Sequence, residues 1–242
     1  MMRCTALGVG DAFSARWYST CLLFEYRGFR LLVDCPHPIR KIIAESSPEL
    51  DLRDIDAVLL THLHGDHCSG LEGLGFYARF VLGRRVPLYA WTPVAERIWE
   101  RLAPGMDRLR DSVDGPATPR TLDDYFKLHP MTLEQPTNIG PFSVALRPTL
   151  HHIPTTALRI SVGGRTLGYS ADTAFDPSLI AWLEDSDRIV HETNLGTHTP
   201  LDALLGLPAP VRERLLLVHY PDEFDVDGSP LRCFRQGETV TV

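Results

Sequence analysis

THLHGDHCSGL, residues 61–71, is the stretch that decides the fold of this protein. It directly follows DAVLL, residues 56–60, whose apolar second half predicts a strand with both faces covered. Because alternate residues of a strand share a face, His62 and His64 are expected to project to the same side of the strand end. Gly65 permits the tight backbone path that must follow. The polar side chains of this stretch should therefore gather at one edge of a sheet.

The polar side chains of this stretch are of the types that bind zinc. Imidazole nitrogen holds zinc at roughly 2.0–2.1 Å and carboxylate oxygen at about 2.0–2.2 Å. Asp66 and His67 follow the turn and can reach a position next to that of His62 and His64. A lone histidine in a loop is usually a solvated polar residue, but a cluster of histidines and an aspartate directly behind a buried strand gains nothing from packing. The stretch therefore predicts a metal site.

Strand and helix patterns run along all 242 residues, 44% of which are hydrophobic. This length suits one sizeable core, so we predict a single domain over residues 1–242. A run of strands, a helix, a second run of strands and another helix favour an α/β fold with two sheets inside and helices outside. Composition alone does not choose between this sandwich and other α/β arrangements. Strands are predicted at residues 3–8, 21–26, 30–34, 56–60, 86–90, 142–149, 157–162, 165–170, 188–191 and 214–218.

Proline positions mark the predicted helices. One helix is expected to open at Thr92, as the N-cap, with Pro93 at the first helical position, and another to follow Pro177. Between about residues 103 and 140, prolines and glycines predict a loop-rich excursion around a short helix over residues 122–128.

Charge and cysteine content restrict the partners and the compartment. The net charge of −7 does not suit non-specific binding to nucleic acid, whose affinity comes mainly from lysine and arginine at phosphates. The N-terminal residues 1–7, MMRCTAL, lack a basic region followed by a long apolar run, and no stretch has the length needed to cross a bilayer. The five cysteines form no Cys-x-x-Cys pair, which is typical of reduced thiols. We therefore expect a cytoplasmic protein without membrane partners.

Residues 61–67 also match, residue for residue, the His-x-His-x-Asp-His signature of the metallo-β-lactamase superfamily. The match most resembles the ribonuclease Z-like branch, in which Thr-His-x-His-Gly-Asp-His is followed by Gly-Leu. LGVGDA at residues 7–12 is similar to the branch's opening strand and glycine turn. LVDC at residues 32–35 looks like its strand that ends in a buried aspartate, here Asp34. The resemblance implies a four-layer αββα sandwich, the metallo-β-lactamase fold.

The resemblance extends to three further metal ligands. HHIP at residues 151–154 is similar to the stretch with the third histidine, which selects His151 over His152. YSADT at residues 169–173 looks like the segment with the bridging aspartate, Asp172, although Ala171 stands in place of a glycine. LVHY at residues 217–220 resembles the strand that ends in the last ligand, His219. The implied centre has one site from His62, His64 and His151, a second from Asp66, His67 and His219, and Asp172 between them.

Two divalent ions are the cofactors that this arrangement implies, with zinc favoured and manganese or iron as alternatives. Two ions about 3.5–4 Å apart can share a water, lower its pKa and hold it as hydroxide. Asp66 could orient that hydroxide through its second oxygen. His191, in the HET segment at residues 191–193, is similar to the histidine of the branch's His-Glu-Ala-Thr segment, which is implicated in phosphodiester chemistry. His198, on the following loop, is a second candidate to protonate a leaving alkoxide, although a polar residue at a strand end can equally cap a loop.

One departure from the branch narrows the substrate. Bacterial ribonuclease Z carries a long tRNA-grasping arm between its third histidine and its bridging aspartate, whereas only 21 positions separate His151 from Asp172 here. With the acidic net charge, this argues against tRNA and favours a small phosphodiester such as a cyclic nucleotide. Arg16 could meet its phosphate, or could only pack its own loop.

Other functions remain open on the sequence. The same metal set serves hydrolases of carboxylic esters, lactones or thioesters, and RNA 3′ processing endonucleases of the ribonuclease Z type. A metal-stabilised binding protein is a third class. Members of the branch often form dimers, so a homodimer is an expectation from the resemblance.

Overall fold

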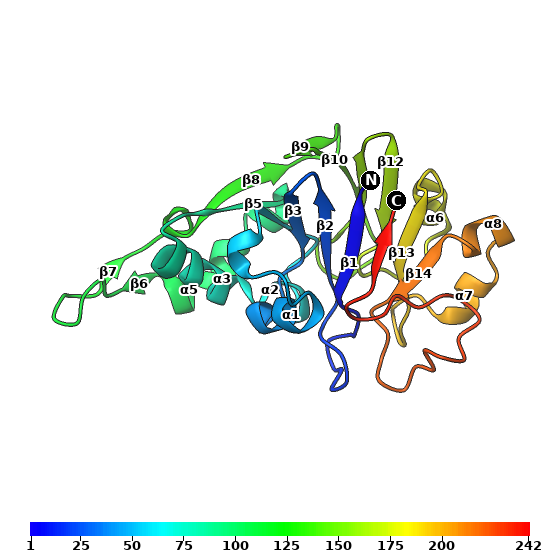
Figure 1. The fold of residues 1–242 in the computed structure, drawn as a ribbon, viewed down its shortest axis with the longest axis horizontal. Coiled ribbons are helices and arrows are strands. Elements are labelled where there is room, and N and C mark those ends of the chain that lie inside the picture. Colours follow the sequence, from blue (N-terminus) through cyan, green and yellow to red (C-terminus); the bar gives the residue numbers. More distant parts are fainter.

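A computed structural model describes residues 1–242 and contains two large sheets with helices on their outer sides (Figure 1). The first sheet has seven strands in the order β15-β1-β2-β3-β4-β5-β8, and the second has six in the order β14-β13-β12-β11-β10-β9. Buried side chains of both sheets belong to one apolar core, in which the rings of Phe24 and Phe142 meet edge to face at 6.4 Å. The predicted α/β arrangement, two sheets inside and helices outside, is confirmed.

The first sheet changes from antiparallel to parallel pairing along its width. β1, β2 and β3 pair antiparallel, whereas β3, β4, β5 and β8 run parallel. A second apolar core lies between this sheet and the helices α1 (Ile39–Ser46), α3 (Leu71–Tyr77) and α5 (Ile98–Met106). The strands are β1 (Arg3–Gly8), β2 (Cys21–Tyr26), β3 (Phe29–Val33), β4 (Ala57–Leu60), β5 (Val86–Trp91), β8 (Phe126–Met131) and β15 (Thr239–Thr241).

The second sheet ends in two parallel pairs, β12 with β13 and β13 with β14. β11 and β12 form a hairpin whose turn, Gly163-Gly164, has positive φ angles of 60° and 77°, as a two-residue hairpin turn requires. Its strands are β9 (Thr137–Ile139), β10 (Phe142–Pro148), β11 (Thr156–Val162), β12 (Arg165–Tyr169), β13 (Arg188–Glu192) and β14 (Leu215–Val218), and its helices are α6 (Pro177–Leu183), α7 (Leu201–Leu205) and α8 (Ala209–Arg212).

The excursion over residues 103–140 is more regular than predicted. The expected helix over residues 122–128 is wrong: a 3-10 turn, Leu122–Asp124, leads into β8, which pairs with β5. β8 is an edge strand, where Pro130 is tolerated because it does not need to donate to a further neighbour. A small hairpin of β6 (Arg108–Leu109) and β7 (Thr118–Pro119) projects from the body (Figure 1).

The helix expected after Thr92 is interrupted. α4 (Thr92–Ala95) ends before α5 begins at Ile98. Trp91, not Thr92, is the N-cap, and the hydroxyl of Thr92 donates to the carbonyl of Met131 at 3.0 Å instead of capping the helix. None of the helices combines the length and apolar character that a bilayer crossing needs.

Candidate metal centre

Polar loops that follow the ends of several strands meet at one place in the molecule. The segment with α2 (Gly65–Cys68) follows β4, Asp172 follows β12, and His219 follows β14. His151 lies in the short connection between β10 and β11. Ligand-type residues from both sheets are thus brought together, as the family resemblance implies.

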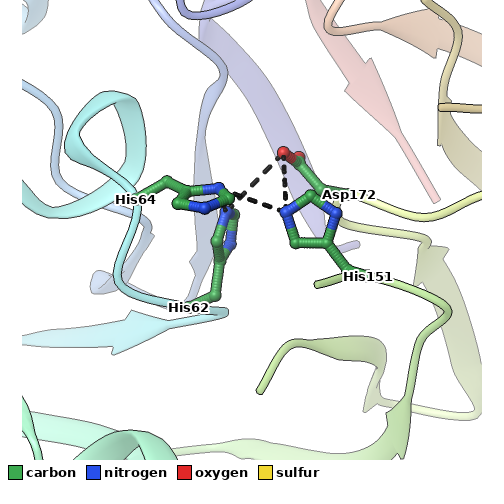
Figure 2. A group of neighbouring side chains, drawn as sticks. All are labelled: His62, His64, His151 and Asp172. Atoms are coloured by element: carbon green, nitrogen blue, oxygen red, sulfur yellow. Dashed lines mark hydrogen bonds and ion pairs between the residues drawn. The ribbon is translucent and has the colours of Figure 1, made fainter. Parts of the chain in front are cut away.

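Four of these residues form the first cluster: His62, His64, His151 and Asp172. Nδ1 of His64 lies 3.1 Å from Nε2 of His62 and 3.1 Å from Nε2 of His151. Oδ2 of Asp172 lies 3.6 Å from Nε2 of His62 and 3.9 Å from Nε2 of His151. Figure 2 shows His62 and His64 facing His151 and Asp172 across a common centre.

The second cluster shares Asp172 and adds Asp66, His67 and His219. Nε2 of His67 lies 3.3 Å from Oδ2 of Asp66 and 3.3 Å from Oδ1 of Asp172. Oδ2 of Asp172 lies 3.5 Å from Nε2 of His219. Asp172 therefore presents its carboxylate to both clusters, which is the position that the family resemblance implies for it.

The spacing of these atoms fits metal ligands. Ligand atoms held tetrahedrally at roughly 2.0–2.1 Å from an ion lie about 3.3 Å from one another. Buried polar atoms without partners are also costly, yet Nε2 of His67 and Oδ1 of Asp172 are buried and accept or donate no hydrogen bond. Both clusters can therefore hold a metal ion.

Asp34 orients one histidine of each cluster. Its fully buried carboxylate accepts hydrogen bonds from Nδ1 of His67, at 2.8 Å, and from the backbone N–H and the hydroxyl of Thr61. The same hydroxyl lies 2.9 Å from Nδ1 of His62. With both Nδ1 atoms engaged, the Nε2 lone pairs of His62 and His67 face the two clusters, the tautomer that a metal ion needs. The buried aspartate expected at the end of its strand thus supports the site without entering it.

The two clusters differ electrostatically. Burial lowers the pKa of His62, and it lowers the pKa of His151 to about 4, so both imidazoles are neutral near pH 7. Burial opposes the charge of His67 too, but the carboxylates of Asp172, Asp34 and Asp66 raise its pKa well above the usual value. A cation at the second cluster must therefore displace a proton, whereas the first cluster is already in its ligand form.

Backbone strain accompanies the clusters. Asp34, Ala171 and His219 have positive φ angles of 62°, 49° and 60°, a backbone conformation that residues other than glycine rarely adopt. Strained residues of this kind persist where the surrounding structure over-determines them, and they concentrate at functional sites. Ala171 adopts this conformation at the position where the resemblance leads one to expect glycine.

His198, not His191, faces the clusters. His191 is buried, and its Nδ1 lies 2.7 Å from the carbonyl oxygen of Glu192. The ring centroid of His198 lies 5.6 Å from that of His151 and 5.4 Å from that of His219. The structure therefore does not bring the predicted catalytic residue His191 together with the metal-type ligands, and its ring bonds to the backbone instead.

A buried glutamate that the sequence analysis overlooked holds His198. Nδ1 of His198 lies 3.0 and 2.9 Å from the two carboxylate oxygens of Glu192, which also accepts the backbone N–H of Thr173. This hydrogen bond raises the pKa of His198. The signal was present: neighbouring residues of a strand point to opposite faces, so His191 and Glu192 could not both face the centre.

Arg16 is held at the surface by Asp222 and by the neighbouring Trp17 of its own loop. Its guanidinium donates to the backbone carbonyl of Asp222 at 2.9 Å and lies 4.6 Å over the ring of Trp17. The structure does not place Arg16 in either cluster, and it supports the alternative in which this arginine packs its loop.

The chain matches known proteins along nearly its whole length. The sequence pattern of the family described as "Anti-Pycsar protein Apyc1" matches residues 2–233. The Anti-Pycsar protein Apyc1 of Bacillus phage BSP38 is 32% identical over 255 aligned positions, which cover 96% of this chain and 95% of that protein.

Among solved structures, the metallo-beta-lactamase fold protein YhfI from Bacillus subtilis is similar, with a TM-score of 0.73, 23% identity and coverage of 91% of this chain and 87% of that one. The short form of human tRNase Z has a TM-score of 0.74 at 17% identity, covering 99% and 98%. These two likenesses confirm the metallo-β-lactamase fold.

Proposed function

The chain belongs to the Apyc1 family, and from this premise we propose that it is a metal-dependent phosphodiesterase acting on a small phosphodiester such as a cyclic nucleotide. The observation that carries the proposal is the pair formed by His198 and Glu192 beside two clusters of metal-type ligands. The clusters alone would serve many hydrolases. The pair adds a proton donor, which favours substrates whose leaving group needs a proton.

The proposed cofactors are two divalent ions, with zinc as the ion that imidazole and carboxylate ligands suit best. His62, His64 and His151 would hold one, Asp66, His67 and His219 the other, and Asp172 would reach both. When bound, such ions supply Lewis acidity toward the phosphoryl oxygens and lower the pKa of a water nucleophile.

His198 is the proposed general acid. Hydrolysis of a phosphodiester breaks a P–O bond, and the departing alkoxide must gain a proton. Glu192 engages Nδ1 of His198 and favours its protonated form, which leaves the proton on Nε2 to be donated. A thiolate leaves without such help, so the pair favours a phosphodiester over a thioester. Asp66 would orient the attacking water through the oxygen that does not face His67.

The interval between His151 and Asp172 supports a small substrate. The hairpin of β11 and β12 occupies residues 156–169, which leaves only short connections on either side. A tRNA-grasping arm has no place there, and the net charge of −7 disfavours a polyanionic partner. We therefore propose a small molecule as the substrate rather than RNA. That the protein forms a homodimer stays a prediction.

Asp66→Ala tests the metal-dependent mechanism. We expect turnover of bis-p-nitrophenyl phosphate by zinc-reconstituted protein to fall by at least ~10²-fold, since loss of residues that merely support a metal ligand already costs about 10–100-fold. Circular dichroism should show an unchanged fold. Asp114→Ala, at an exposed aspartate outside both clusters, is the matched control. Full activity in the Asp66 variant would contradict the mechanism.

His198→Ala tests the proton donor through the leaving group. Turnover of a 3′,5′-cyclic nucleotide, whose leaving alkoxide needs a proton, should fall by about 10²–10⁴-fold. Hydrolysis of bis-p-nitrophenyl phosphate, whose phenolate leaves unaided, should fall far less. His191→Ala, in contrast, should lower the thermal midpoint without a leaving-group preference. If the His191 variant showed that leaving-group preference instead, His191 and not His198 would be the general acid.

A further inference from the structure

A cavity of about 400 Å³ opens beside the second cluster. His198 and His219 form part of its wall, so a group bound there would lie next to the proposed proton donor. Its volume lies within the usual range for small-molecule sites, roughly 300–1,000 Å³. The rest of the wall comes from two loops, one around Phe13 and one around Leu195, and from Pro221 and Glu223.

Each of these loops presents a large apolar side chain to solvent. Phe13 is 91% exposed and Leu195 is 75% exposed, and both line the cavity. Exposed apolar side chains are common singly, but two at the mouth of one cavity, next to catalytic-type residues, are characteristic of a binding site.

Hydrogen bonds fasten the two loops to each other. The largely buried carboxylate of Asp11 accepts the backbone N–H of Phe13 at 2.9 Å and the side-chain amide of Asn194 at 3.0 Å. The amide of Asn194 also donates to the carbonyl of His219, and its side-chain oxygen accepts the backbone N–H of Leu195. The backbone at Phe13 and at Leu195 is thus held in place relative to His219.

The Phe13 loop has a second anchor on its other side. The carboxylate of Asp222 accepts the hydroxyl of Ser14 at 2.5 Å and the backbone N–H of Ala15 at 2.8 Å. The loop therefore cannot fold Phe13 back onto the body without losing these bonds. An aromatic ring on such a loop is exposed to water, and stacking of a flat partner on it is therefore favourable.

We propose that Phe13 and Leu195 form a subsite for the nucleobase of the substrate, with the base stacked on Phe13 and its edge against Leu195. This subsite rests on the proposed function, because its ligand is the base of a cyclic nucleotide whose phosphate lies at the clusters. Stacking of a base on an aromatic side chain contributes about 1–3 kcal/mol and tolerates every base. The subsite therefore selects for the presence of a base more than for its identity.

The test compares two substrates that differ only in the base. Kinetic constants are measured for a 3′,5′-cyclic nucleotide and for the abasic ribose 3′,5′-cyclic phosphate, with the wild type, Phe13→Ala and Phe13→Trp. Phe13→Ala should lower kcat/KM for the nucleotide about tenfold, mainly through KM, because stacking contributes equally to ground and transition states. The abasic substrate should be unaffected, and Phe13→Trp should retain nucleotide turnover.

Phe80→Ala is the control, since Phe80 is another exposed phenylalanine that does not line this cavity. Equal loss on both substrates, or no loss on either, would overturn the subsite while leaving the phosphodiesterase intact. A change of oligomeric state in Phe13→Ala with unaltered base preference would show instead that a second copy of the chain covers Phe13. If the wild type hydrolysed neither substrate, the proposed cyclic-nucleotide function, and with it the subsite, would be wrong.

Discussion

Among single residues, Asp34 has the widest influence on the candidate centre. One buried carboxylate sets the orientation of His67 directly and that of His62 through Thr61. Burial raises the pKa of Asp34, while the charge of His67 and the hydrogen bonds lower it, so the ionised form depends on its partners. Each cluster thus depends on a residue that belongs to neither.

Asp34→Asn tests whether the carboxylate of Asp34 orients the histidines, because it changes the hydrogen bonds but not the size of the side chain. The amide keeps the size of the carboxylate, but it has only one acceptor oxygen, so the hydrogen bonds from His67 and from Thr61 cannot both be kept. We expect zinc affinity to fall about 10–100-fold and the free energy of unfolding to fall by about 1–3 kcal/mol. Competition with a chromogenic chelator and urea unfolding measure the two effects. Wild-type zinc affinity in this variant would show that Asp34 does not orient the ligands.

Among elements, the single turn of α2 relies on a close approach to the end of β3. The backbone N–H of Cys35 donates to the carbonyl of His67 at 2.7 Å, and that of Gly70 donates to the carbonyl of Cys35 at 2.8 Å. A Cβ atom at Gly70 would lie 2.3 Å from the carbonyl oxygen of Pro36. The position of Asp66 and His67 therefore depends on a residue without a side chain just beyond the turn.

Gly70→Ala should displace this turn. Overpacking against backbone costs typically about 1–3 kcal/mol, and the shift should also weaken zinc binding. Gly73→Ala is the matched control, because Gly73 lies in α3 with open space around it. Alanine there should stabilise the protein by about 0.5–1 kcal/mol through its helix propensity. Chemical denaturation of both variants measures the contrast, and equal stabilities would contradict this account of α2.

For the whole molecule, the centre connects the two sheets. The 61–71 stretch extends from the first sheet, whereas His151, Asp172 and His219 follow strands of the second. An ion held by both groups would bind the folded chain and not the unfolded one, so binding must add to the stability of the whole.

Chelation should therefore lower the thermal midpoint of the protein. Metal at 100 times its dissociation constant stabilises by about 2.7 kcal/mol, and a chain of this size shifts by roughly 2–4 °C for each kcal/mol. We expect a difference of roughly 5–10 °C between zinc-loaded and chelated protein in scanning calorimetry. Asp172→Ala should lose most of this difference, since Asp172 faces both clusters. Identical midpoints with and without zinc would exclude an ion that connects the sheets.

The sequence by itself determined the features that depend on near neighbours in the chain. Apolar runs predicted the central strands, and the density of ligand-type residues in the 61–71 stretch predicted a metal site. The more distant ligands needed the family resemblance, because no local pattern ties His151, Asp172 and His219 to one point.

Only the tertiary structure decided which polar residues meet. β8 is a strand because it pairs with β5. This pairing joins two separate segments of the chain, so the local propensity of either segment does not predict it. His191 is buried and His198 faces the clusters because Glu192, on the other face of β13, reaches out to hold it. Likewise Arg16 lies against Asp222, more than two hundred positions away in the chain. Such pairings depend on strand register and loop path, which arise from packing of the whole chain rather than from any one segment of it.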